Sequence, residues 1–377
     1  MKHRYKLLCT CLLSALLTNC KKDNELKPGD QSFSNFNQVF EKFWNGINSN
    51  YVYWDIDTTN WDNKYRQFKP LFEKLDVNNT ADIDKSVSYF KQMTSSLIDS
   101  HFQILGLNGN FQGLNIFPAS NRKKASSSYH DPYNYSKLDT KYFDSITTDT
   151  SGTLSIKIAT IQKKILYFSC NEFSLAKAYS TDQNIHSLFD QFFQKATDDI
   201  ASPTGIIIDV RNNFGGDLVD LNFLVGHFIN ASLDFGFSRY KSNLGRLDYT
   251  PWIKASIVPA LNSKKISCPI IVLVDNYTVS VAEALAMSIH LLPNSTIIGE
   301  QTWGATGPLA PNEVFNDGQF QVGNLFSVYT SSAEFKYIDG KMYEGIGFSP
   351  DIPIAFNEQV LNKGIDPQLE TAISLLK

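Results

Sequence analysis

The chain has 377 residues, enough for one large domain or two moderate ones with a substantial buried core. Hydrophobic residues make up 42% of the sequence and charged residues 19%, as is usual for a globular protein. The net charge of -4 is small, and no block of lysine and arginine recurs along the chain, so the composition argues against a nucleic-acid-binding protein.

The first twenty residues have the pattern of an export signal. A basic segment, MKHRYK, precedes the apolar run LLCTCLLSALL, which is too short to span a bilayer as a stable helix. The run ends in LTNC, which resembles the lipobox of bacterial lipoproteins, where the cysteine is lipidated. We therefore expect a lipoprotein signal peptide over 1–20 with Cys20 as the lipidation site, a polar tether over 21–32, and a lipid anchor in the cell envelope of a bacterium. A plain signal peptide or a short membrane anchor is the alternative.

Cysteine usage indicates neither a disulfide framework nor a metal site. Three of the five cysteines precede the tether, and only Cys170 and Cys268 follow it. Both lie beside apolar strand-like runs, so we expect buried free thiols, with a single disulfide as the alternative. No cysteine and histidine cluster has metal-ligand spacing, so the sequence predicts no metal and no cofactor.

Residues 33–105 are expected to form a helical N-terminal subdomain. The segments FNQVFEKFWNGI and DIDKSVSYFKQMTSSLI repeat apolar residues at helical spacing, and an aromatic turn with another helix lies between them. Residues 106–164 are polar, so we expect an irregular connecting region there, with strand-like pieces such as TLSIKIATI.

From 165 to 377 the sequence predicts an α/β core. The apolar runs KILYFSC, GIIIDV, CPIIVLV and STIIG are typical of buried strands. They alternate with helical segments, one of which, TDQNIHSLFDQFFQKATDDI, has Ser180 or Thr181 as its expected N-cap. The fold class is therefore α/β, with a helical subdomain packed on the core.

Two segments of the core have residues suited to acyl transfer. In DNYTVSVAEALAMSIHLL a buried strand ends, a turn follows, and a helix begins near Ser280. The N–H groups at a helix N-terminus favour negative charge, which suits a nucleophile whose attack creates an oxyanion, although a serine there is more often only a cap. In DVRNNFGGD, Gly215 and Gly216 allow a turn that aims backbone N–H groups at an anionic oxygen, although such turns are often purely structural.

Two further segments supply a candidate base and a carboxylate. In IDSHF, Ser100 and His101 stand at the expected end of a helix, and histidine is the side chain whose ordinary pKa suits a base near neutrality. In YEGIGFSPDIPI, Glu344 precedes a glycine-punctuated turn, where a surface carboxylate is the alternative. His130, His186, His227 and His290 have no comparable setting.

Together these segments resemble the C-terminal processing and tricorn serine peptidases. The resemblance is carried by DVRNNFGGD, TVSVAE, STIIGEQTWG and EGIGFSPDIPI, in this order. It implies a ClpP/crotonase-like catalytic core, Ser280 as nucleophile, and an oxyanion hole from the N–H groups of Val281 and of Gly215 or Gly216.

One departure from the processing branch decides the expected mechanism. That branch uses a lysine directly after the aromatic-Gly pair, where this chain has Ala305. The resemblance to the tricorn branch instead implies a tetrad of Ser280, His101, Ser100 and Glu344, with His101 as base and the last two as an orienting relay. The connecting region lacks the loop of a PDZ domain, so we expect none.

The expected function is hydrolysis of peptides or unfolded polypeptides outside the cytoplasm. The alternative is a non-catalytic protein that binds peptides or hydrophobic ligands on the same scaffold, which would be favoured if Trp303 or Tyr277 filled the pocket at Ser280. The sequence leaves open the substrate, the oligomeric state and the membrane face.

Overall fold

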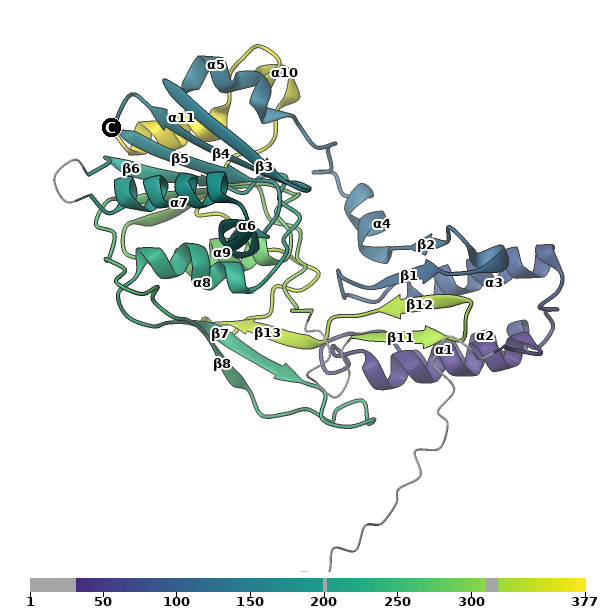
Figure 1. Ribbon diagram of the computed structural model, residues 1–377. Coiled ribbons are helices and arrows are strands. Elements are labelled where there is room, and N and C mark those ends of the chain that lie inside the picture. Colours follow the sequence, from purple (N-terminus) through teal and green to yellow (C-terminus); the bar gives the residue numbers. More distant parts are fainter. Residues whose placement is uncertain (1–31, 199–201, 310–317) are drawn as a thin grey trace, which may run out of the picture.

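The computed structural model describes residues 32–198, 202–309 and 318–377 (Figure 1). The expected signal peptide, with Cys20, and nearly all of the tether lie outside the described residues. Across the described ranges, no helix combines the length and the apolar character needed to cross a membrane.

A seven-stranded sheet forms the centre of the core, with the order β14-β10-β9-β6-β5-β4-β3. Its first five strands are parallel and the last two antiparallel. The strands are β3 (Ser145–Ser151), β4 (Leu154–Ile161), β5 (Ile165–Cys170), β6 (Gly205–Asp209), β9 (Ile270–Val274), β10 (Ser295–Gly299) and β14 (Ile352–Pro353).

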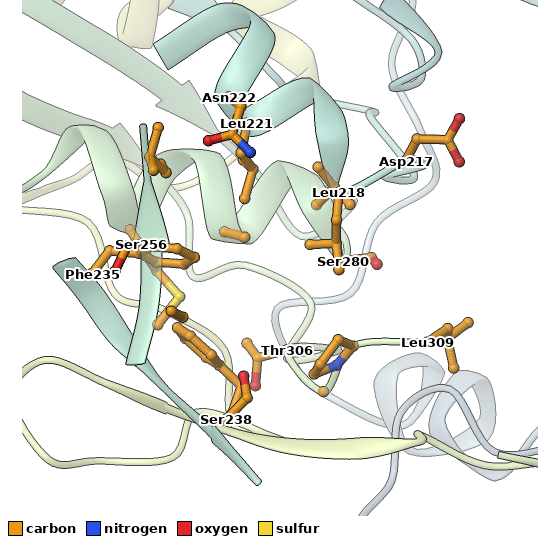
Figure 2. A pocket seen from close by; sticks show the side chains of 18 of the residues that line it. Asp217, Leu218, Leu221, Asn222, Phe235, Ser238, Ser256, Ser280, Thr306 and Leu309 are labelled. Carbon is orange, nitrogen blue, oxygen red and sulfur yellow. The ribbon is translucent and has the colours of Figure 1, made fainter. Parts of the chain in front are cut away.

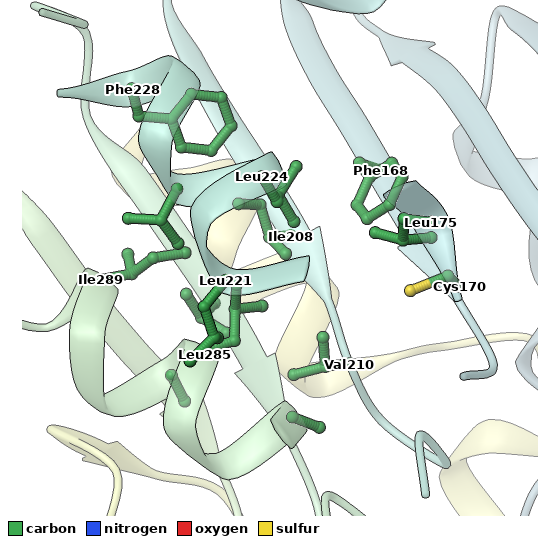
Figure 3. Close-up of a cluster of buried hydrophobic side chains, with 14 of the residues drawn as sticks. Phe168, Cys170, Leu175, Ile208, Val210, Leu221, Leu224, Phe228, Leu285 and Ile289 are labelled. Carbon is green, nitrogen blue, oxygen red and sulfur yellow. The ribbon is translucent and has the colours of Figure 1, made fainter. Parts of the chain in front are cut away.

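Helices cover both faces of this sheet, which explains why its central strands are apolar throughout. Ile206 and Ile208 of β6 face one hydrophobic cluster, shown in part in Figure 3, and Ile207 faces the cluster on the opposite side. The first cluster is closed by α6 (Leu175–Thr181), α7 (Gln183–Ala196), α8 (Val219–Val225) and α9 (Val281–Ile289), and the second by α11 (Pro367–Leu375).

A second, three-stranded sheet extends the core beside α9, with the order β13-β7-β8. Its strands are β7 (Leu233–Tyr240), β8 (Ile253–Ile257) and β13 (Ala333–Tyr337). The remaining short elements are η2 (Gly109–Phe111), α4 (Pro118–Lys124), η3 (Tyr135–Leu138), α5 (Asp139–Tyr142), η4 (Gly226–Phe228) and α10 (Glu358–Leu361).

The N-terminal subdomain contains the three expected helices and, in addition, a four-stranded sheet. The helices are α1 (Phe36–Asn50), α2 (Trp61–Phe72) and α3 (Thr80–Thr94), and the strands are β1 (Gln103–Gly106), β2 (Asn115–Ile116), β11 (Gln319–Val322) and β12 (Phe326–Tyr329). The sheet order is β11-β12-β1-β2, so two of its strands come from the C-terminal part of the chain (Figure 1). Phe326 of β12 packs edge-on against Phe43 and Phe90, and these contacts join the late strand to the early helices.

Two expectations about boundaries need correction, and one about the cysteines is confirmed. The core sheet begins at Ser145, inside the expected connecting region, because β3 and β4 pair with β5. The N-cap of α7 is Asp182 and not Ser180 or Thr181 as expected, because these two residues end α6 and the carboxylate of Asp182 accepts the N–H groups of Asn184 and Ile185. The prediction for the two late cysteines is confirmed, since Cys170 and Cys268 are buried free thiols.

A buried ion-pair network fastens α11 to the core. The guanidinium of Arg211 binds Asp209 at 2.6 Å and Asp366, the N-cap of α11, at 2.9 Å, and it stacks over the ring of Tyr135. Arg211 is only 6% exposed, so both carboxylates depend on it for their countercharge.

We expect Arg211→Met to lower the free energy of unfolding by about 3–5 kcal/mol, because it leaves buried carboxylates without a partner. The measurement is denaturant unfolding followed by circular dichroism. The control is Lys85→Met, which removes an exposed pair with Asp82 and is expected to leave the midpoint unchanged. Equal midpoints for the two variants would contradict the role given to Arg211.

Candidate active site

Ser280 stands at the junction between β9 and α9, in a backbone conformation that few residues adopt. Its φ is 59° and its ψ −119°, and it is the N-cap residue of α9. A positive φ costs free energy in a residue other than glycine, so surrounding contacts must hold it. Such strain at a helix N-terminus is common at functional sites.

Glu283 is the main contact that holds this turn. Its carboxylate is fully buried and accepts four hydrogen bonds, from the N–H groups of Ser280 (3.0 Å), Gly304 (2.7 Å) and Ala305 (2.7 Å) and from the hydroxyl of Thr302 (2.5 Å). Burial raises the pKa of Glu283, and the four donors oppose that shift. The residue at the position of the processing-branch lysine, Ala305, thus contributes only its backbone.

The glycine turn predicted after β6 lies directly against Ser280. The backbone carbonyl of Asn213 accepts the N–H of Val279 at 2.9 Å, and its side chain accepts the N–H of Gly215 at 2.9 Å. Gly215 has a φ of 87°, and a Cβ atom there would lie 2.6 Å from the Cβ of Ser280. Only glycine fits this position.

Two backbone N–H groups beside Ser280 are available to bind an oxyanion. Among the described residues, the N–H groups of Val281 and Gly216 have no hydrogen-bond acceptor, whereas that of Gly215 is bound to Asn213. Of the two glycines that sequence reasoning left open, the geometry therefore favours Gly216 as the second donor to an oxyanion, with Val281 as the first.

A cavity of about 600 Å³ opens beside Ser280 (Figure 2). Polar side chains in its wall include Asp217, Ser238 and Thr306. Within the described ranges no histidine lines the cavity, and neither do Tyr277 and Trp303. Its walls are mainly apolar and come from α8, α9, β7, β8, β13 and the segment after Thr306, with Leu218, Leu221, Phe235, Ile253, Ala255, Ile257, Val281, Ala284, Met287, Pro308, Leu309 and Phe335.

Ser100 and His101 lie in the loop between α3 and β1, not at a helix end as expected, because α3 ends at Thr94. The N–H of His101 donates to Asp99 at 2.8 Å, and its ring Nδ1 lies 3.5 Å from the hydroxyl oxygen of Ser331. Burial lowers the pKa of His101 to about 4, so its imidazole is neutral at pH 7.

Glu344 is buried and bridges the His101 loop to the cavity wall. It accepts the N–H of Ser100 at 2.7 Å and the N–H groups of Thr306 and Gly307 at 2.8 Å each. Burial, together with the charge of Asp99, raises its pKa. The carboxylate therefore binds backbone beside the histidine, and no hydrogen bond joins it to the His101 ring within the described residues.

The structure places the predicted site residues in two groups. Ser280, Val281 and Gly216 share the cavity, while His101, Ser100 and Glu344 form a cluster on the other side of the segment that contains Thr306 and Gly307. Within the described ranges no hydrogen bond links Ser280 to His101, so the assignment of His101 as base stays a prediction. Catalytic contacts are often long in enzymes without substrate and shorten when substrate binds.

Sequence reasoning missed four residues that shape the site: Glu283, Asn213, Asp99 and Ser331. Glu283 had a signal, because a serine followed three residues later by glutamate is a capping box, and Asp99 is adjacent to the proposed pair. Asn213 and Ser331 had none, since their partners are distant in sequence. The four other histidines in the described ranges have partners outside this site. His130 pairs with Glu300 at 2.8 Å, for example.

Comparisons with known proteins identify the family. Residues 164–354, half of the chain, match the model of peptidase family S41. The chain belongs to peptidase family S41.

Two relatives of this S41 chain agree with that assignment. The tricorn protease of Thermoplasma volcanium is 28% identical over 196 residues, which are 52% of this chain and 16% of the relative. The carboxy-terminal processing protease CtpA of Bacillus subtilis is 26% identical over 204 residues, which are 53% of this chain and 39% of the relative. The chain thus matches well under half the length of either.

Solved structures confirm the predicted fold class. A protein from Parabacteroides merdae, described as a candidate peptidase, has a TM-score of 0.67 and 21% identity, over 91% of this chain and 97% of its own. Mature CPAF has a TM-score of 0.61 and 11% identity, over 91% and 96%. The α/β core with its N-terminal subdomain is therefore the fold of these proteins.

The contact between Gly215 and Ser280 gives a test of the turn. Gly113 has a similar φ, 80°, but open space around its Cα. We expect Gly113→Ala to cost about 1 kcal/mol of unfolding free energy through backbone strain alone. Gly215→Ala should cost about 1–3 kcal/mol more, because the new methyl group meets Ser280. Denaturant midpoints measure both, and equal losses would contradict the close packing.

Proposed function

We propose that this S41 chain is a serine endopeptidase that cleaves peptides or unfolded polypeptides, with Ser280 as its nucleophile. The observation that carries the proposal is the strained Ser280 at the N-terminus of α9, with two open N–H donors beside it and an apolar cavity in front of it. This combination supplies a nucleophile, oxyanion stabilisation and a binding site in one place.

In the proposed reaction, Ser280 Oγ attacks the scissile carbonyl carbon while its proton passes to Nε2 of His101. The tetrahedral oxyanion accepts hydrogen bonds from the N–H groups of Val281 and Gly216. His101 then donates the proton to the leaving amine, and a water molecule hydrolyses the acyl-enzyme by the same steps. Ser100 and Glu344 act as positioning residues, because they fix the His101 loop to the cavity wall.

The cavity also supports a preference at the cleavage site. Its walls offer aliphatic and aromatic side chains from Leu221, Phe235, Met287 and Phe335, and its volume of about 600 Å³ accommodates a large residue. We propose that the residue before the scissile bond is apolar, such as leucine, methionine or phenylalanine, because burial of such a side chain is favourable.

The second candidate function is non-catalytic binding of peptides or hydrophobic ligands. The same cavity would serve it, but two observations favour catalysis. Tyr277 and Trp303 pack against each other outside the cavity lining, so they do not fill the space in front of Ser280. A binding protein also has no need of strained backbone at Ser280 or of open donors at Val281 and Gly216.

The test is digestion of a diverse peptide library by the purified full-length chain, read by mass spectrometry. We expect cleavage after apolar residues, and a loss of about 10⁴-fold or more in both Ser280→Ala and His101→Ala, because nucleophile and base act as a unit. His186→Ala, which changes a histidine paired with Asp190 in α7, is the matched control and should keep full activity.

Each other outcome redirects the proposal. A loss only in Ser280→Ala would keep the nucleophile and reject His101 as base. No cleavage by the unmutated chain, with retained binding of apolar peptides, would establish the binding function instead.

We further propose that the protein is exported and anchored in the bacterial cell envelope by a lipid on Cys20. The support is the sequence pattern alone, a basic segment, an apolar run and LTNC.

The expected result is incorporation of an alkyne-labelled fatty acid into the wild-type chain in growing bacteria and none into Cys20→Ala, with recovery of the wild-type chain in the membrane fraction. Cys170→Ala is the control, since this buried thiol is far along the chain. Equal labelling of wild type and Cys20→Ala would overturn the anchor.

A further inference from the structure

We propose that Asp99 and Ser331 form the relay that orients His101, with Ser331 accepting from the ring and Asp99 supplying the stabilising charge. The inference rests on the proposed role of His101 as base. It replaces Ser100 and Glu344 as the direct partners of the ring, because Glu344 accepts the backbone N–H of Ser100, whereas the ring Nδ1 lies 3.5 Å from the hydroxyl oxygen of Ser331.

The hydrogen bonds around Asp99 fix the direction of the relay. Asp99 Oδ1 accepts the hydroxyl of Ser331 at 3.0 Å and the N–H of His101 at 2.8 Å, and Oδ2 accepts the N–H of Ser331 at 2.7 Å. A serine hydroxyl has one proton, and here that proton is given to Asp99. Ser331 Oγ therefore presents a lone pair to Nδ1 of His101, 3.5 Å away.

This direction selects one tautomer of the ring. Nδ1 must carry the hydrogen if it is to donate to Ser331, which leaves Nε2 unprotonated and able to accept the proton of a nucleophile. The contact is at the long end of the hydrogen-bond range, as is common before substrate binds.

Burial makes the charge of Asp99 effective. Asp99 and Ser331 are both fully buried, and the guanidinium of Arg122 acts on Asp99 through its charge, which opposes the rise in the pKa of that carboxyl. The nearby guanidinium of Arg122 donates instead to the carbonyl groups of Leu97 and Ile98. Among the described residues no cation donates a hydrogen bond to Asp99, so its carboxylate would stabilise the imidazolium that forms during reaction.

The topology explains why these residues meet. β1 and β12 pair antiparallel, with Gln103 opposite Tyr329, so the residues before β1 face the residues after β12. This places Asp99 and His101 beside Ser331. Ser331 also lies next to Gly307 of the cavity wall, where an added Cβ would be 2.7 Å from its hydroxyl oxygen.

The relay predicts a pH dependence with a defined sign. The ionisable groups that face this cluster are Tyr51, Tyr53, Asp57, Arg122 and Glu344. Burial raises the pKa of Asp99 to about 6 and lowers that of His101 to about 4. Activity needs anionic Asp99, so it should fall as pH decreases through about 6, before His101 itself is protonated.

The kinetic test measures hydrolysis of fluorescein-labelled casein, at low substrate concentration, between pH 4 and pH 9. We expect Ser331→Ala to lower the rate about 10- to 100-fold and Asp99→Asn by about 10³-fold. In both variants the pH at which the rate falls on the acidic side should move from about 6 towards 4. The reason is that protonation of Asp99 no longer affects the His101 ring, so only protonation of the ring itself lowers the rate. Ser331→Thr, which keeps the hydroxyl, should restore most of the rate and the wild-type limb.

The control is Ser86→Ala, which removes another fully buried serine hydroxyl, one that bonds within α3. It should leave the pH profile unchanged. An acidic limb in Ser331→Ala identical to that of the wild type, or no rescue by threonine, would show a merely structural role and overturn the relay.

A second measurement separates this inference from the proposed function. Nitrogen-15 NMR of histidine-labelled protein reports the ring tautomer without any substrate, with His101 assigned by its absence in His101→Gln. We expect the Nδ1–H form in the wild type and a mixture in Ser331→Ala. A wild-type chain that does not cleave casein but shows this change would lose the proposed function and keep the relay. The Nε2–H form in the wild type, or no change in Ser331→Ala, would overturn the relay whatever the activity.

Discussion

The buried carboxylate of Glu283 stabilises the backbone conformation of Ser280, on which the rest of the site depends. It accepts four hydrogen bonds, and one of them holds the backbone of Ser280 at a positive φ. The same carboxylate fixes Gly304 and Ala305, so the nucleophile turn and the segment leading to the cavity wall share one anchor. The hydrogen bond from Val279 to Asn213 and the packing of Gly215 against Ser280 support the same turn, so the strained conformation is held from both sides.

Carboxylates on backbone donors recur through this site. Glu344 joins the loop of His101 to Thr306 and Gly307 in the way that Glu283 joins Ser280 to Ala305. Each buried anion is satisfied by N–H groups rather than by a lysine or arginine, so each fixes loop geometry as well as charge. A loss of one such acceptor would leave several buried donors unpaired at once, which couples the two halves of the site.

The sequence predicted the elements whose pattern is local, and it failed where pairing is distant. The strands around Ile207 and the helix that follows Ser280 were predicted from apolar runs and from their alternation with helical segments. The pairing of β11 and β12 with the strands of the N-terminal subdomain could not be predicted, because the sequence of a short strand does not indicate which strand it pairs with. Ser331 was missed for the same reason, since its role depends on the pairing of β12 with β1.

The position of β12 in the N-terminal sheet also determines how the His101 loop and the Ser280 turn are connected. The residues of the His101 loop belong to the N-terminal subdomain, whereas Ser280 belongs to the core, and the chain between β12 and β13 passes directly from one to the other. Ser331 lies on that passage. A displacement of the subdomain would therefore move His101 and Ser331 as a pair, keeping the ring tautomer while changing its distance from Ser280. The orientation of the His101 ring and its distance from Ser280 are thus separate properties of this fold. The pairing of β1 with β12 sets the orientation, and the position of the N-terminal subdomain on the core sets the distance.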